Sequence, residues 1–266
     1  MNGQLPKINF VDMPILREIH SIGGFFPDKL PDDQGNWVYR ILRTHPELEM
    51  IYSINDEQEK ETFLRNYILR FRRKNATHIE LCKVGIENFW TSTEKRDLTL
   101  LSEAIEIAWP AERPVITALV SINPICPRFL DDWSFSLFAT PDMGRAMETI
   151  LHECCHFLYF EKWKEVFPNS DPETFNAPHQ EWILSELSAP IILRKKLGLP
   201  KARFYNEYCE VIIEGKRAPQ FFTGIFLTSR NFEAFLRKAY KKIKKYSSFF
   251  PDIRAHISEL KTVSEI

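Results

Sequence analysis

Two histidines and a glutamate within one pentapeptide have the types and spacing needed to bind and use a metal ion. Residues 152–156 read His-Glu-Cys-Cys-His, and residues four apart lie on the same face of a helix. The imidazoles of His152 and His156 can therefore point at one ion. Glu153 lies about 100° around the helix from His152 and about 60° from His156, so it flanks the same face. A carboxylate in that place can accept a proton from a metal-bound water.

The residues around the pentapeptide are those expected of a buried helix. Residues 149–151 and 157–158 are uncharged, and so are Cys154 and Cys155. The H-E-x-x-H pattern should arise by chance in about one chain per hundred of this size. In an ordinary buried helix the histidines would be satisfied by hydrogen bonds alone, but burying this polar trio without a partner is costly. The adjacent cysteines lack the C-x-x-C spacing of zinc ribbons.

A catalytic zinc ion is usually held by three protein ligands and one water, so a third ligand is expected downstream. Tyr159 and Lys162 stand where the elongated metzincin pattern has Gly and a third His, which excludes that class. The next candidates are Glu181 and Glu186, both within a predicted helix at residues 177–190.

With these residues the chain resembles the zincin metallopeptidases, and within them the gluzincin branch, in which a glutamate from a following helix completes the zinc site. The resemblance rests on residues 149–158 and 180–193. Glu186-Leu-Ser-Ala is similar to the Glu-x-x-Ala pattern of several gluzincins, including the ImmA/IrrE-like group. Glu181 is similar instead to the thermolysin-like ligand, but the following Ser and acid fall one position late. The resemblance implies three Zn²⁺ ligands: His152, His156 and Glu186.

Pro190 departs from the gluzincin pattern, in which a polar residue often follows the Ala. A proline inside a helix removes the backbone hydrogen bond to the carbonyl four residues earlier, which here belongs to Glu186. We therefore expect a kink at this ligand, and Glu181 stays open as the alternative.

The resemblance implies peptide-bond hydrolysis by a zinc-activated water, with Glu153 as general base. A second donor should stabilise the oxyanion, and the candidates are His179, Tyr205 and Tyr208. The expected partner is a peptide or protein substrate. The alternative is a non-catalytic or partner-specific regulatory protein that retains the zincin scaffold. Glu153 favours the enzyme, because a protein that only binds has no need of that carboxylate.

Composition limits the classes of protein that fit. The chain has 266 residues, 44% of them hydrophobic, which is enough for a sizeable core. A formal net charge of −1 gives no overall field that would attract nucleic acid or a membrane, and neither partner is expected. The five cysteines form no regular framework and fit free thiols in a reducing cytosol. No apolar run approaches about 18 residues, so we expect a cytoplasmic protein.

Apolar periodicity predicts the elements that must position the site. The helix carrying the pentapeptide should begin with Thr140 or Asp142 as its cap. The other predicted helices cover residues 56–74, 92–109, 201–215 and 231–246. The predicted strands cover residues 78–84, 113–122 and 132–139.

These elements indicate an α+β, zincin-like fold with a small mixed sheet, an edge strand over the active-site helix and a mainly helical C-terminal part. Residues 132–139 resemble the zincin edge strand, which pairs with extended substrate, and the alternative is a plain core strand. Residues 1–90 form a region of uncertain role, and residues 91–266 the metallopeptidase domain. The lysine-rich face of 231–246 is interpreted as solvated, with nucleic acid or anionic lipid as the alternative partner.

Overall fold

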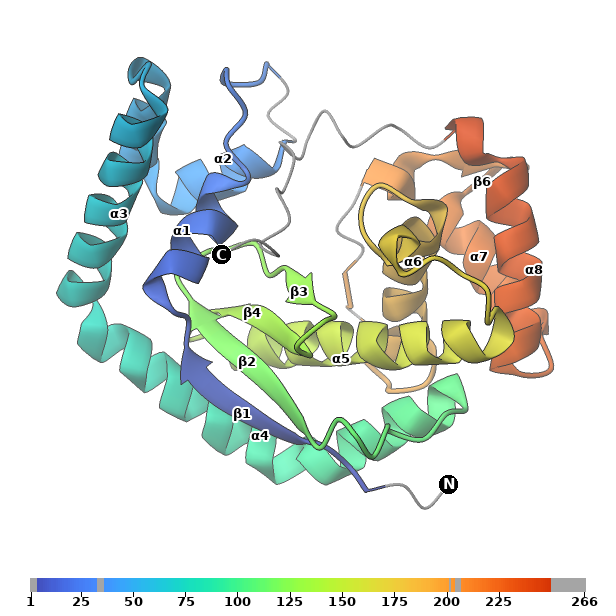
Figure 1. The fold of residues 1–266 in the computed structure, drawn as a ribbon. Coiled ribbons are helices and arrows are strands. Elements are labelled where there is room, and N and C mark those ends of the chain that lie inside the picture. Colours follow the sequence, from blue (N-terminus) through green and yellow to red (C-terminus); the bar gives the residue numbers. More distant parts are fainter. Residues whose placement is uncertain (1–3, 33–35, 201, 204–206, 250–266) are drawn as a thin grey trace. The chain divides into compact units, whose positions relative to one another are not determined.

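The computed structural model describes residues 4–32, 36–200, 202–203 and 207–249. Within them the chain is a mixed α and β protein in which helices predominate (Figure 1). The helices are α1 (Ile15–Gly23), α2 (Trp37–Thr44), α3 (Glu57–Lys74), α4 (Ala76–Ile105), α5 (Met143–Val166), α6 (Gln180–Lys195), α7 (Ala218–Thr228) and α8 (Phe232–Lys245). The strands are β1 (Lys7–Asp12), β2 (Val115–Ser121), β3 (Arg128–Phe129), β4 (Ser134–Phe138), β5 (Ile212–Ile213) and β6 (Lys216–Arg217). The 3-10 helices are η1 (Pro46–Ser53), η2 (Pro172–Phe175), η3 (Glu207–Glu210) and η4 (Ser247–Phe249).

Packing divides the chain into two compact units, and the long helices α4 and α5 contribute to both. Of the described residues, unit 1 comprises those within 4–7, 91–114 and 148–249. Unit 2 comprises those within 8–90 and 115–147. The division into residues 1–90 and 91–266 stays a prediction. In packing terms, the segment with β2 and β4 groups with the first 90 residues, because these strands share a sheet with β1.

A four-stranded sheet with the order β1-β2-β4-β3 forms the centre of unit 2 (Figure 1). β2 and β4 are parallel, with Thr117 opposite Ser134 and Ser121 opposite Phe138, and β3 is antiparallel to β4. Five of the seven residues of β2 are buried. A strand covered on both faces is largely apolar, and the many β-branched residues of 113–122 predicted such a buried strand.

β4 confirms the predicted strand at 132–139 but corrects its expected position. It lies between β2 and β3, so the edges of this sheet are β1 and β3, and the prediction of an edge strand is wrong. β4 is buried on both of its faces, because even Ser134 and Ser136 are only 2% and 0% exposed. The Ser136 amide also donates a hydrogen bond to the Pro127 carbonyl at 2.8 Å. β2 and β3 therefore flank β4 on both sides, although its alternating polar and apolar residues alone would predict one solvent-facing side.

Two ionisable side chains, those of Glu18 and His45, are buried in the core of unit 2. Glu18 is 0% exposed, and its carboxylate accepts hydrogen bonds from the Ser121 hydroxyl and the Ile122 amide, both at 2.8 Å, and pairs with Arg72 at 3.0 Å. His45 is also 0% exposed and lies 2.8 Å from both the Ile122 carbonyl and the Tyr67 hydroxyl. Because a carbonyl only accepts, Nε2 of His45 carries the proton and Nδ1 accepts from Tyr67.

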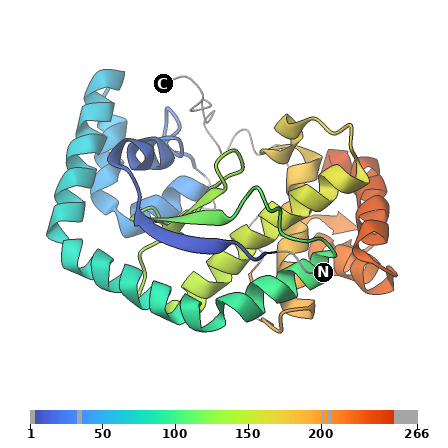
Figure 2. The same ribbon diagram turned by 60° about the horizontal axis from the view of Figure 1, so that its bottom comes forward.

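α4 is one continuous helix where the sequence predicted a strand at 78–84 and a helix only from residue 92 (Figure 2). Residues 78–84 form its first turns, so the strand predicted there is wrong, and the helix predicted from residue 92 is its second half. The buried residues of the first half of α4 recur at helical spacing: Ile79, Cys82, Ile86 and Trp90.

Among the described residues, no helix is long and apolar enough to cross a membrane.

Unit 1 contains most of α5 and all of α6, α7 and α8. The helices α6, α7 and α8 pack against one another. Asp142 caps α5 by accepting a hydrogen bond from the Arg145 amide at 3.0 Å, as predicted. Asn231 caps α8 in the same way, and this helix confirms the one predicted at 231–246.

Residues 201–215 were predicted to be helical, and their described part is not. It contains η3 and the first strand of a β5–β6 hairpin. Glu214 and Gly215, between the strands, have φ values of 49° and 75°. A type I′ hairpin turn has this left-handed backbone at both central positions. A right-handed helix therefore cannot extend through Glu214 and Gly215.

Candidate metal centre

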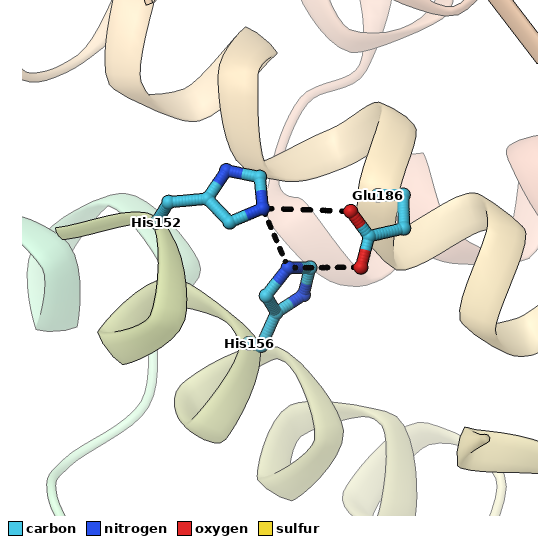
Figure 3. Close-up of side chains that lie close together, drawn as sticks. All are labelled: His152, His156 and Glu186. Atoms are coloured by element: carbon cyan, nitrogen blue, oxygen red, sulfur yellow. Dashed lines mark hydrogen bonds and ion pairs between the residues drawn. The ribbon is translucent and has the colours of Figure 1, made fainter. Parts of the chain in front are cut away.

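The side chains of His152, His156 and Glu186 converge between two helices of unit 1 (Figure 3). The histidines project from α5 and the glutamate from α6. The two Nε2 atoms lie 3.0 Å apart. Nε2 of His152 is 3.4 Å from Oε2 of Glu186, and Nε2 of His156 is 3.3 Å from Oε1. Among the described residues, these three form the one group of histidine, cysteine or carboxylate side chains whose donor atoms could hold a metal ion.

The distances within this trio fit a zinc ion. Tetrahedral zinc with ligands at about 2.0–2.1 Å places the ligand atoms about 3.3–3.4 Å from one another. The two nitrogen–oxygen separations, 3.3 and 3.4 Å, match this value, and the 3.0 Å between the two Nε2 atoms is slightly shorter. Two imidazole nitrogens and a carboxylate are also a known catalytic zinc donor set. The residues present therefore fit the ion that the sequence predicts.

With Glu186 ionised, hydrogen bonds among the three side chains explain their arrangement less well than a bound cation does. Each imidazole carries at most one proton on Nε2. If both Nε2 atoms are protonated, two donors face each other across 3.0 Å. If only one is protonated, the other lone pair faces a carboxylate oxygen at 3.3 or 3.4 Å. A cation among the three side chains makes every contact favourable, because all of them then present lone pairs to it.

Burial and aromatic packing fix the trio. The side chain of His156 is 0% exposed, that of His152 8% and that of Glu186 10%. His156 therefore lies deepest, and solvent reaches the site past His152 and Glu186. The ring of Phe160, one turn further along α5, stacks on His156, and Phe175 stacks on Phe160. These aromatic contacts were not predicted, although Phe160 follows His156 by four residues and therefore lies on the same helical face.

Glu153 and the two cysteines lie on the same turns of α5 and are all buried. Burial, and then the charge of Glu153, raises the pKa of the Cys154 thiol well above its ordinary value. Cys154 therefore stays protonated and is a core residue. Neither cysteine belongs to the donor group.

Glu181 is placed apart from the trio. Its Oε1 accepts a hydrogen bond from the hydroxyl of Tyr240 on α8. The Tyr240 ring meets Trp163 of α5 edge-on at 4.7 Å. Tyr240 thus contacts both helices that supply the trio, a role with no signal in the sequence. Beyond Glu186, α6 continues through Pro190 to its end, so the proline does not terminate the helix.

The expected oxyanion donors have different surroundings. His179 is the N-cap residue of α6, is partly exposed and makes no side-chain cap hydrogen bond. Tyr208 is fully buried and packs edge-on against Trp182. Tyr205 lies outside the described residues. His179 is not part of the donor group, and the packing of Tyr208 is that of a core residue.

Comparisons with protein-family models, with curated proteins and with solved structures found no match to this chain.

Proposed function

We propose that the chain is a zinc-dependent metallopeptidase with a zincin-like fold of the gluzincin branch. His152, His156 and Glu186 would hold the Zn²⁺ ion, and Glu153 would be the general base. The observation that carries the proposal is the convergence of two Nε2 atoms and one carboxylate at 3.0 to 3.4 Å. Glu186 is preferred to Glu181 as the third ligand because the carboxylate of Glu181 is engaged by Tyr240.

The residues of the site have separable roles in this proposal. Zinc, when bound, would lower the pKa of a water to about 7 and polarise the substrate carbonyl. Glu153 would accept the proton of that water and deliver it to the leaving amine. It follows His152 directly on α5, so the base and the ligand are held by the same turn of a buried helix.

A regulatory protein that retains the scaffold is the second candidate, and one observation favours it. The three donor side chains are at most 10% exposed, so little of their surface is accessible to a substrate. A site of this kind suits one specific partner protein better than many. A cytoplasmic location is proposed from the thiols, since all five cysteines are free.

Hydrolysis of fluorescently labelled casein tests the proposal. Zinc-loaded protein should release fluorescence, lose this activity on chelation and regain it when zinc is added back. The His152→Ala protein, folded by circular dichroism, should stay inactive throughout. Stoichiometric zinc without hydrolysis of casein would support the partner-specific alternative. A wild-type protein that binds no zinc would overturn both.

A further inference from the structure

Five basic side chains form one stripe along the exposed side of α8. At 100° per residue their positions fall within about 120° of arc, and they extend over about 12 Å of helix. The opposite side of α8 is buried, including Phe235, Leu236 and Ile243, so its packing fixes which side faces outward. The exposed residues of this basic stripe are Arg237, Lys238, Lys241, Lys244 and Lys245.

Most of the stripe is not paired with acidic side chains of the described residues. Arg237 pairs with Glu233 at 2.8 Å. Within the described part of the chain, none of the four lysines of the stripe forms a salt bridge with an acidic side chain. Cations stabilise the last turn of a helix through its dipole, but Lys238 and Lys241 precede that turn. Helix stability therefore leaves these two charges unexplained.

The stripe and the candidate metal centre belong to the same unit. Tyr240 lies on α8 among the stripe residues, and its hydroxyl is bonded to Glu181 of α6, the helix that carries Glu186. A segment bound along the stripe would therefore be held at a constant position relative to the helix that carries Glu186. We propose that the basic stripe binds an acidic segment of the protein substrate. This inference rests on the peptidase function proposed above.

Other polyanions fit the stripe less well. Insertion into a bilayer needs exposed apolar side chains, and none of the large exposed hydrophobic residues of the described chain lies on α8. Single-stranded nucleic acid is bound by stacking bases on aromatic rings. Here the ammonium groups of Lys244 and Lys245 lie over the rings of Tyr240 and Tyr246, at 4.4 and 5.2 Å. An extended peptide of about four residues matches the length of the stripe.

Binding of a labelled peptide of about ten glutamates, with a glutamine peptide of equal length as control, tests the proposal by fluorescence anisotropy. The test variant is Lys238→Glu/Lys241→Glu/Lys244→Glu. The matched control is Lys95→Glu/Lys164→Glu/Lys216→Glu, which changes net charge equally at lysines of unit 1 outside α8. We expect the stripe variant to bind the glutamate peptide roughly tenfold or more weakly, and the control variant to bind it nearly as wild type.

Equal weakening by the two variants would overturn the proposal, because net charge alone would then explain binding. It would also be overturned if wild type bound anionic vesicles or single-stranded DNA but not the glutamate peptide. Zinc content is measured in parallel and should be the same in all three proteins. Loss of peptide binding with zinc retained is a failure of the stripe alone, whereas absence of zinc from wild type is a failure of the proposed peptidase.

Discussion

Glu186 and His156 come from different helices, and their carboxylate oxygen and Nε2 atom lie 3.3 Å apart. The contact brings α5 and α6 together at the point where the histidines face a carboxylate. Five positions earlier on α6, Glu181 points its carboxylate to Tyr240 of α8 instead. Five positions correspond to about 500° of helix, or about 140° around its axis. Because both glutamates lie on α6, only one of them can face the histidines.

Replacing Glu153 with glutamine separates zinc binding from hydrolysis. The glutamine amide cannot accept the proton from the attacking water, while His152, His156 and Glu186 are unchanged. We expect casein hydrolysis to fall by about 10²–10⁴-fold with the zinc content retained. The matched control is Glu161→Gln, on the same helix and paired with the exposed Lys164. Full activity in the Glu153→Gln protein would remove this residue from the mechanism.

Glu18→Gln should strongly destabilise unit 2. The substitution leaves the guanidinium of Arg72, only 15% exposed, without its carboxylate. Breaking a buried pair in this way costs about 3–5 kcal/mol. Glu47→Gln breaks the exposed pair with Arg70 and should cost about 0–1 kcal/mol. Urea unfolding measures both, and similar values for the two variants would show that the burial of Glu18 does not matter.

His45 should make unit 2 less stable in acid. Burial lowers the pKa of its imidazole below the ordinary value. In the unfolded chain this histidine binds a proton near pH 6.5, whereas folded His45 stays neutral to lower pH. The unfolded state therefore holds more protons between these two pKa values, and the free energy of unfolding falls as pH drops below about 6.5.

The pH test compares urea midpoints at about pH 7.5 and about pH 5.5. His45→Gln, which keeps a donor and an acceptor, should reduce the loss of stability in acid. His78→Gln, at an exposed position, serves as the control and should behave as wild type. If His45→Gln retained the full wild-type dependence on pH, the buried imidazole would not be its source.

Elements with one clear apolar period were predictable from the sequence. α3 and α8 have one buried stripe each, and β2 is rich in β-branched residues. The first half of α4 was mistaken for a strand because apolar residues also occupy its exposed side, where Leu81 is 68% and Val84 42% exposed. Their alternation with polar neighbours hid the helical spacing of Ile79 and Cys82.

The site itself was predictable only as far as local spacing reaches. His152 and His156 share a face of any helix that contains them. The choice between Glu186 and Glu181 depends on how α6 rotates against α5 and α8, and tertiary contacts such as the Tyr240–Glu181 hydrogen bond set that rotation. The position of β4 inside its sheet likewise depends on β3, a pairing partner of only two residues.

Zinc content by mass spectrometry, measured on wild type, Glu186→Gln and Glu181→Gln after equal dialysis, tests whether Glu186 is the third zinc ligand. We expect about one zinc ion per chain in wild type and in Glu181→Gln, and a large loss in Glu186→Gln. The two variants carry the same chemical change on the same helix, so they control for each other. Equal zinc in Glu186→Gln and wild type, or zinc lost only from Glu181→Gln, would contradict the proposed metal centre.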